Sequence, residues 1–340
     1  MSFVPNLKKT NHHSTEQALL VNNIFDVAVP FNEKVFEVFR YQYQHNAIYR
    51  EWCNMMQNKP GETTSVAAIP FLPISFFKTH NVVCGDFEPE TVFQSSGTTQ
   101  ATVSSHFVKD VSVYRKSFLK GFELFYGDIK SWCVIALLPS YLERKNSSLV
   151  MMAEELIQFS NHPLNGFYIY NFDKLYDVLS ELESAGQKTL LLGVTFGLLD
   201  FAEIYSLKLH RTVVMETGGM KGRRRELTRQ EVHDMLKEKT GVDNIHSEYG
   251  MTELLSQAYS RGDGKFFCPP WMKVLVRNEE DPMQISLSGR GILNIIDLAN
   301  IYSCSFIATE DIGIVEEDGS FEVSGRMDNS DIRGCSLMVL

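Results

Sequence analysis

Five apolar runs, separated by segments with helical patterning, constrain the fold of this chain more than any other feature. The runs are rich in valine and leucine and are continuous, with no alternation between apolar and polar residues. Continuous runs of this length are typical of strands that are buried on both faces. They lie at residues 132–138, 189–194, 211–215, 291–297 and 306–308. The sequence therefore predicts an α/β fold in which helices cover a buried sheet.

Local signals add three elements to this prediction. Aromatic residues recur at three- and four-residue spacing over 31–56, which favours helix. A capping box at Thr228 and Glu231 predicts the start of another helix, and Gly241 predicts its end. An Asp-Gly turn between β-prone arms predicts a hairpin over 313–323. No repeat or Pro/Ser-rich linker interrupts the chain, so its composition does not support a boundary in the middle.

The bulk composition is that of a globular protein with no polyanionic partner. A chain of 340 residues that is 44% hydrophobic can bury a substantial core. Its net charge of −10 argues against nucleic-acid binding, because affinity for phosphates requires a basic surface. The longest apolar stretches, at 132–138 and 190–199, fall short of the roughly 20 residues that a membrane helix needs. We expect no nucleic-acid partner and no membrane span.

The spacing of the cysteines and the N-terminal residues bear on the cellular location of the protein. The six cysteines follow no Cys-x-x-Cys or His-bracketed spacing, which argues against a disulfide scaffold or a zinc site. Residues 1–17 carry lysine, asparagine and histidine where a secretion signal would need an apolar core. Both features predict a cytoplasmic protein.

Two short polar segments carry the chemistry. The first, Ser95-Ser96-Gly97-Thr98-Thr99, places hydroxyl groups around a glycine between two strand-like stretches, 92–94 and 103–108. Hydroxyl groups and exposed backbone N–H groups of such a loop can surround a polyphosphate. It is not a Walker loop, which would read Gly-x-x-x-x-Gly-Lys-Ser/Thr and open a helix. Taken alone, a segment of this composition is more often an ordinary hairpin turn.

The second segment is Tyr249-Gly250-Met251-Thr252-Glu253, which puts a threonine hydroxyl beside a carboxylate. Proteins usually hold Mg²⁺ with one or two carboxylates plus the phosphates of a substrate. The pair therefore suits a phosphate oxygen and its Mg²⁺. The chemistry and order of the two segments point to ATP-dependent activation of a carboxylic acid.

At these residues the sequence resembles the adenylate-forming superfamily, whose members make an acyl-AMP and pass the acyl group to a thiol. Three stretches look like the LuxE-type acyl-protein synthetase branch, with phenylacetate-CoA ligases as more distant relatives. The stretches are Leu-Pro-Ser-Tyr-Leu-Glu-Arg at 138–144, Glu-Thr-Gly-Gly-Met-Lys-Gly at 216–222 and His-Ser-Glu-Tyr-Gly-Met-Thr-Glu at 246–253. The similarity extends from about residue 69 to the C-terminus.

The resemblance implies a large N-terminal domain of packed mixed sheets with flanking helices over residues 1–325, with 1–68 as a helical lead-in. In the superfamily a small mobile C-terminal domain follows. Here the sequence stops soon after Gly325-Arg326-Met327-Asp328, where that domain would begin. Residues 326–340 would then be a short remnant that carries Cys335. The small domain, and the lysine that it normally supplies, would be essentially truncated.

The resemblance also implies a role for individual residues. Ser95 to Thr99 would surround the β- and γ-phosphates of ATP, Thr252 would contact phosphate, and Glu253 would hold Mg²⁺. Tyr249 would line the junction between adenine and the acyl group, and Asp311 would bind the ribose hydroxyls. The implied cofactor-binding residues are Ser95, Ser96, Gly97, Thr98, Thr99, Gly218, Gly219, Tyr249, Gly250, Asp311 and Arg326, and the implied catalytic residues are Thr252, Glu253 and Cys335.

Cys335 is the candidate nucleophile of the second half-reaction. In the acyl-protein synthetase branch a cysteine near the C-terminus accepts the acyl group as a thioester before a reductase receives it. The thiolate is the reacting form, and Arg333 would lower the pKa of this thiol whereas Asp331 would oppose that shift. The alternative is a small buried side chain, a frequent fate of free cysteine.

Departures from the superfamily pattern leave alternatives open. Gln100 stands where a further glycine is usual, and no lysine follows in 101–106. The compensating cation could be His106, Lys78 or Lys221, and His246 either faces the acyl site or makes a buried hydrogen bond.

Three functions follow from these features. The first is an acyl-protein synthetase that acts on a carboxylic acid, expected to be a fatty acid, with an acyl-accepting reductase or another acyl-transfer protein as partner. The second is a ligase that acylates coenzyme A or a carrier phosphopantetheine, as phenylacetate-CoA ligases do with the former. The third is a non-catalytic protein that binds a nucleotide or an acyl group.

Overall fold

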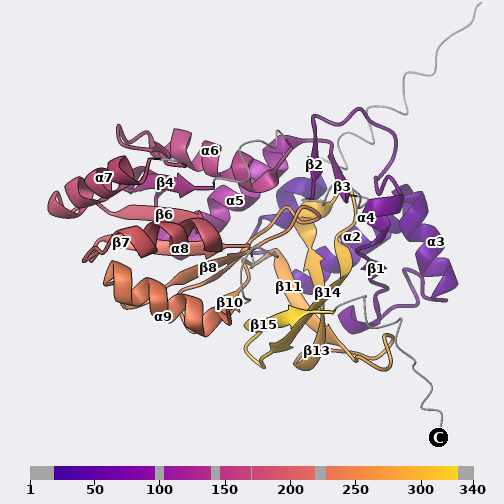
Figure 1. The fold of residues 1–340 in the computed structure, drawn as a ribbon. Helices are drawn as coiled ribbons and strands as arrows, with labels where there is room; N and C mark the ends of the chain where they lie inside the picture. The colour runs from indigo at the N-terminus through magenta and orange to yellow at the C-terminus, as the bar shows by residue number, and fades with distance from the viewer. Residues whose placement is uncertain (1–18, 96–102, 139–145, 170, 219–226, 328–340) are drawn as a thin grey trace, which may run out of the picture.

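The computed structural model describes residues 19–95, 103–138, 146–169, 171–218 and 227–327 (Figure 1). Its α-helices are α2 (Phe31–His45), α3 (Ala47–Met55), α4 (Phe76–Thr79), α5 (Val111–Tyr126), α6 (Ser148–Ser160), α7 (Phe172–Ser184), α8 (Thr195–Ile204) and α9 (Arg229–Thr240). The first strands are β1 (Leu72–Pro73), β2 (Thr91–Gln94), β3 (Ser105–Val108), β4 (Cys133–Leu137), β5 (Gly166–Phe167), β6 (Thr189–Val194), β7 (Thr212–Thr217) and β8 (His246–Tyr249). The later strands are β9 (Ala258–Ser260), β10 (Lys265–Phe267), β11 (Met272–Arg277), β12 (Ile285–Ser286), β13 (Gly289–Asp297), β14 (Phe306–Val315) and β15 (Phe321–Arg326).

The first half of the large sheet is parallel, in the order β5-β4-β6-β7-β8. Strands β4, β6 and β7 coincide with the apolar runs at 132–138, 189–194 and 211–215, so those predictions are confirmed. Every residue of β4 and β6 is buried. Their continuous apolar pattern follows from this double burial, since both faces of each strand meet covering helices.

Helices cover the two faces of these strands. Val134 and Ala136 of β4 belong to one hydrophobic cluster, together with residues of α5 and α6. Cys133, Ile135 and Leu137 of the same strand belong to a second cluster with α7, α8 and α9. In Figure 1 the parallel strands lie at the left, with α6 above them and α9 below. The predicted α/β class is confirmed.

The second half of the sheet is antiparallel, in the order β8-β9-β10-β15-β14-β13-β11-β12, and β1 pairs with β14. The runs at 291–297 and 306–308 lie within β13 and β14. Strand β14 continues seven residues beyond its predicted run, to Val315. Residues 309–312, between this run and the predicted hairpin, were missed because most of them are only partly buried and they include the polar pair Glu310-Asp311. The hairpin predicted over 313–323 is confirmed as β14 and β15.

Helical character over 31–56 is confirmed, but it belongs to two helices. Asn46 separates α2 from α3 with an extended backbone, at φ −105° and ψ 107°. Its side-chain oxygen accepts a hydrogen bond from the N–H of Tyr49 at 2.9 Å and so caps α3. Asparagine is favoured at such caps because its side chain replaces the missing intrahelical acceptor. Figure 1 places α2, α3 and α4 at the right, beside β14.

Two smaller predictions concern the elements next to the polar segments. β2 and β3 form a separate two-stranded antiparallel sheet around residues 96–102, which lie outside the described residues. Helix α9 has the predicted capping box at Thr228 and Glu231, and Gly241 ends it at φ +73°.

Among the helices that the structure describes, none combines the length and the apolar character that crossing a bilayer requires.

Candidate functional site

The parallel strands bring two of the predicted segments together. Tyr249 ends β8, and Gly218 follows directly after β7, which pairs with β8 so that Thr217 lies opposite Glu248. In open α/β sheets, ligands bind outside the carboxyl ends of the parallel strands. Gly218 and the Tyr249–Glu253 segment therefore lie next to each other at the edge where a ligand site is expected. Gly219 lies outside the described residues.

Tyr249 joins this edge to the β14–β15 hairpin. Its hydroxyl donates a hydrogen bond to Asp311 Oδ2 at 2.7 Å. Asp311 lies opposite Arg326 in the register of the hairpin, and Arg326 Nε is 3.9 Å from Asp311 Oδ1. Burial, followed by the neighbouring Asp311 carboxylate, raises the pKa of Tyr249, so the phenol stays protonated and acts as a donor. Three predicted site residues from distant parts of the sequence thus form one polar cluster.

Arg326 contributes a half-exposed positive charge to this cluster. Its Nη2 atom lies 3.2 Å from Glu310 Oε2, and half of its side chain is exposed. An exposed ion pair of this kind contributes little to folding stability. The guanidinium group is therefore available to an anionic ligand at low cost.

Glu253 is a buried carboxylate beside the β2–β3 hairpin. Only 6% of the residue is exposed. Burial raises its pKa, while a hydrogen bond with Ser104 and the charges of Arg326 and Lys78 act in the opposite direction. Because burial outweighs these groups, a cation bound beside Glu253 would favour its charged form. Lys78, one of the candidate compensating cations, is thus close enough to influence the site.

Ser95 connects the first polar segment to Glu253. Its N–H donates to the carbonyl oxygen of Ser104 at 3.1 Å, and the Ser104 N–H donates to Ser95 Oγ at 2.9 Å. Ser104 in turn forms a hydrogen bond with Glu253. The two predicted segments therefore meet through a single serine. The remaining predicted residues of the first segment, Ser96, Gly97, Thr98 and Thr99, lie outside the described part of the chain, as do Cys335 and Lys221.

Gly250 has a steric role that the sequence did not reveal. A Cβ atom at this position would lie 2.5 Å from Glu248 Oε1. Glu248 is buried and accepts a hydrogen bond from the Thr217 hydroxyl. Burial raises the pKa of Glu248 to about 7. A side chain at position 250 would therefore require the carboxyl group of Glu248 to shift.

A buried network that sequence reasoning missed supports the end of β7. Glu216 Oε1 lies 3.0 Å from His233 Nε2 and accepts a hydrogen bond from Ser247 Oγ at 3.1 Å. Thr195 Oγ1 lies within 3.3 Å of Glu216 Oε2 and donates to the carbonyl oxygen of Gly218 at 3.1 Å. The network thus holds Gly218 in place. A glutamate at the end of the apolar run 211–215 was the signal that could have indicated it.

His246 makes a buried hydrogen bond. Its Nδ1 atom lies 3.1 Å from the hydroxyl of Tyr126, and burial lowers the pKa of the ring to about 4. His246 begins β8, whereas the predicted site residues lie at the other end of the strand. Of the two interpretations that the sequence left open, this contact favours the buried hydrogen bond.

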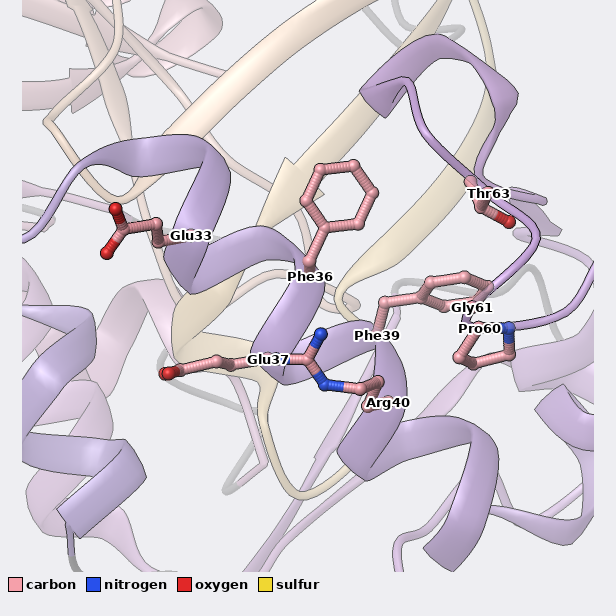
Figure 2. Close-up of a pocket in the computed structure, with 8 residues that line it drawn as sticks. All are labelled: Glu33, Phe36, Glu37, Phe39, Arg40, Pro60, Gly61 and Thr63. Carbon is pink, nitrogen blue, oxygen red and sulfur yellow. The ribbon is translucent and has the colours of Figure 1, made fainter.

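Two surface hollows among the described residues lie elsewhere. One lies between α2 and the loop at 60–63 and is lined by Phe36, Arg40 and Thr63, among others (Figure 2). The other lies at the opposite end of β7 and β8, beside His246. No predicted site residue lines either hollow. Within the described ranges, no group of three or more His, Cys, Asp or Glu side chains could hold a metal ion.

Solved structures share this fold. A 2-hydroxyisobutyryl-CoA ligase in complex with 2-HIB-AMP and CoA matches 96% of this chain and 75% of its own, with a TM-score of 0.64 and 12% identity. ATP-bound MatB from Rhodopseudomonas palustris matches 69% of this chain with a TM-score of 0.53 and 16% identity. The match covers 47% of the MatB chain, about half of its length. The fold is therefore that of the adenylate-forming enzymes.

Sequence comparison identifies the branch. The family described as "Acyl-protein synthetase, LuxE" matches residues 26–340. The long-chain-fatty-acid--luciferin-component ligase of Aliivibrio fischeri is 24% identical over 332 residues, which cover 89% of this chain and 86% of that protein. The enzyme of the same name from Vibrio harveyi is 23% identical over 325 residues, 88% of this chain and 84% of that protein. The chain belongs to the LuxE family of acyl-protein synthetases, and its sequence-based identification as a ligase of this family is confirmed.

Proposed function

We propose that this protein activates a carboxylic acid with ATP and transfers the acyl group to a thiol. The observation that carries the proposal is that contacts and strand pairing link four sequence segments near the carboxyl ends of β7 and β8. Ser95 reaches Glu253 through Ser104, Tyr249 contacts Asp311 and Arg326, and Gly218 lies beside Tyr249 across the β7–β8 pair. Each segment is one to which the family resemblance assigned a part of the ATP site.

The chemistry of these side chains fits ATP and Mg²⁺. Asp311 presents a carboxylate for the ribose hydroxyls, and Arg326 presents a half-exposed cation for phosphate. Glu253 is a buried carboxylate, so a bound Mg²⁺ would relieve the cost of its burial. Together with Thr252 it would hold the metal and a phosphate oxygen. When bound, Mg²⁺ would neutralise charge on the phosphates.

The first half-reaction needs this concentration of charge. A carboxylate oxygen of the acid attacks the α-phosphorus, the bond to the bridging oxygen breaks, and pyrophosphate leaves. All reacting groups are anionic, so catalysis depends on positive charge and hydrogen-bond donors aimed at the phosphates. Arg326 and the hydroxyl of Thr252 would supply them from the described residues, and Ser96 to Thr99 would add hydroxyl and N–H donors.

For the second half-reaction we propose Cys335 as nucleophile. Its thiolate would attack the acyl carbon, AMP would leave, and a thioester would form. The other five cysteines support this choice, because burial raises the pKa of each thiol and keeps it protonated: Cys53, Cys84, Cys133, Cys268 and Cys304. All five are free thiols, in keeping with a reducing cytoplasm as the proposed location.

We propose a long-chain fatty acid as the substrate, because two relatives that match along most of their length are named for such an acid. The acyl group would then pass to a partner protein, and a reductase is the expected partner. Coenzyme A is the alternative acceptor.

The test is an ATP-dependent hydroxamate assay across acids of graded chain length. Hydroxylamine traps the activated acyl group whichever thiol normally receives it, so wild-type protein should form hydroxamate with a preferred chain length. No hydroxamate with any acid, together with intact ATP binding in calorimetry, would instead support a non-catalytic nucleotide-binding protein.

Cys335→Ser should abolish covalent labelling of the protein by radioactive fatty acid and leave hydroxamate formation intact. Cys268→Ser is the matched control, because Cys268 is the most exposed of the described cysteines and its pKa is raised to about 12. Labelling that survives in Cys335→Ser and disappears in Cys268→Ser would reverse the assignment. Rapid formation of free acyl-CoA by the wild type would favour the ligase alternative.

A further inference from the structure

His106 occupies a buried position between the two polar segments. It lies on β3 and is 1% exposed. Its ring packs edge-on against Phe77, with 5.6 Å between centroids and 77° between planes. Both ring nitrogens have partners: Nδ1 lies 3.0 Å from the carbonyl oxygen of Thr252, and Nε2 lies 2.9 Å from Ser303 Oγ. The side chain therefore connects the β2–β3 hairpin directly to the backbone of the Tyr249–Glu253 segment.

The chemistry of the two partners determines which nitrogen carries the proton. The carbonyl oxygen of Thr252 can only accept, so Nδ1 must be the donor. A neutral ring then offers Nε2 as an acceptor, and the Ser303 hydroxyl donates to it. Ser303 is itself well anchored, because its carbonyl oxygen accepts hydrogen bonds from Asn46 Nδ2 at 2.9 Å and Cys84 Sγ at 3.2 Å. Nε2 of His106 is thus bonded to an anchored residue of the core, and Nδ1–H donates to Thr252.

The neighbouring peptide groups are held in a similar way. Asn300 Nδ2 donates to the carbonyl oxygen of Glu253 at 2.7 Å. The N–H groups of Leu255 and Ser256 donate to Asp297 Oδ2 at 2.8 and 2.9 Å. Asp297 is the last residue of β13, and Asn300 lies in the segment that follows it. Of His106, Asn300 and Asp297, only His106 lies on the β2–β3 hairpin, so it connects Thr252 to the hairpin that precedes and follows residues 96–102.

We infer that His106 is a positioning residue, whose Nδ1–H sets the backbone of Thr252 relative to the β2–β3 hairpin so that both segments address the same phosphates. The inference rests on the proposed adenylation function. Displacement of a catalytic group by about 1 Å can cost roughly 100-fold in rate, and the two segments belong to different sheets. Ser104 joins the same hairpin to the Glu253 side chain, whereas His106 holds the backbone of Thr252 and is therefore suited to controlling the spacing of the two segments.

Two variants separate positioning from folding. In His106→Asn the amide NH₂ can take the place of Nδ1 and donate to Thr252, but the contact with Ser303 is lost. In His106→Gln the longer side chain reaches the place of Nε2 and keeps Ser303, but Thr252 loses its donor. Each variant gives up one of two hydrogen bonds, so their melting temperatures should fall by similar amounts.

Their activities should differ. We expect His106→Asn to keep acid-dependent ATP–pyrophosphate exchange within about fivefold of wild type, and His106→Gln to lose about 100-fold in kcat. The KM for the acid should change little in either variant, because neither contact involves the acid. Equal losses in the two variants, or losses that follow only the melting temperature, would overturn the inference.

Two readouts make the result independent of turnover. MgATP affinity measured by calorimetry should be about tenfold weaker in His106→Gln than in His106→Asn, and equal affinities would count against the inference. ¹⁵N spectra of histidine-labelled protein, with the His106 signal assigned by its loss in His106→Asn, should show the proton on Nδ1. A proton on Nε2 would overturn the inference. A wild-type protein that binds MgATP but exchanges no pyrophosphate with any acid would refute the proposed function and leave these two readouts to decide the role of His106.

Discussion

At the scale of single residues, burial determines the protonation states at the candidate site. Tyr249 keeps its proton and donates to Asp311, because burial and the adjacent carboxylate both disfavour a phenolate. Glu248 lies on β8, is buried, and has the Thr217 hydroxyl as its hydrogen-bond donor. Its raised pKa has a consequence for stability, because the folded protein binds its proton more tightly than the unfolded chain does.

Glu248→Gln tests this consequence. The pKa of Glu248 rises from 4.5 in the unfolded chain to about 7 in the fold, so the wild type loses stability relative to the variant as pH rises between these values. The relative loss should amount to roughly 3 kcal/mol at most. Urea unfolding of both proteins at pH 5 and pH 7.5 measures it. The same substitution at Glu317, which is exposed in the β14–β15 turn, is the control. A pH-independent difference between wild type and Glu248→Gln would refute the assigned pKa.

At the scale of elements, the β14–β15 hairpin carries both Asp311 and Arg326 and sets their distance. The register of the hairpin shifts between Ile312 and Gly313, next to Asp311 and Arg326. A Cβ atom at Gly313 would collide with the backbone carbonyl oxygen of Glu322 on the opposite strand. This glycine therefore allows the two strands to approach closely where the ladder is irregular.

Gly313→Ala should separate the strands and lower the free energy of unfolding by about 2 kcal/mol or more, because a backbone atom cannot move aside as a flexible side chain could. Gly325→Ala is the matched control in the same hairpin, since a Cβ atom there meets nothing within 4 Å. Urea unfolding of both variants measures the difference. The prediction fails if the two alanines have the same effect.

At the scale of the whole molecule, the N-terminal helices are built into the same core as the site. Gln42 of α2 is completely buried, and its amide donates to the carbonyl oxygens of Asn300 and Ile301 at 2.9 and 3.2 Å. Its side-chain oxygen accepts from the N–H of Ser305 at 2.9 Å. Asn300 also holds Glu253. One helix near the start of the chain thus supports the segment that positions the proposed metal ligand.

Gln42→Leu should remove this support. The substitution leaves buried backbone donors and acceptors unpaired, so we expect a loss of about 3 kcal/mol in the free energy of unfolding. Unfolding should remain a single transition when followed by both circular dichroism and tryptophan fluorescence. Gln44→Leu, on an exposed position of the same helix, should have little effect. Separate transitions for the two probes would show that the helices unfold independently.

The sequence alone determined the fold class, the family and three of the five parallel strands, β4, β6 and β7, because strands buried on both faces require continuous apolar runs. The capping box at Thr228 and the turn at Gly319 could also be predicted from the sequence, since both depend on contacts within a few residues. The roles of the individual site residues stay proposals.

Only the tertiary structure decided how the site is supported. Contacts such as those from His106 to Thr252, from Tyr249 to Asp311 and from Gln42 to Asn300 join residues that are remote in the sequence. No local pattern records them, because the hydrogen-bond partner of a buried polar side chain is selected by packing. For the same reason residues 309–312, in the middle of β14, escaped prediction: they pair with neighbouring strands, and their own pattern of apolar and polar residues does not indicate a strand.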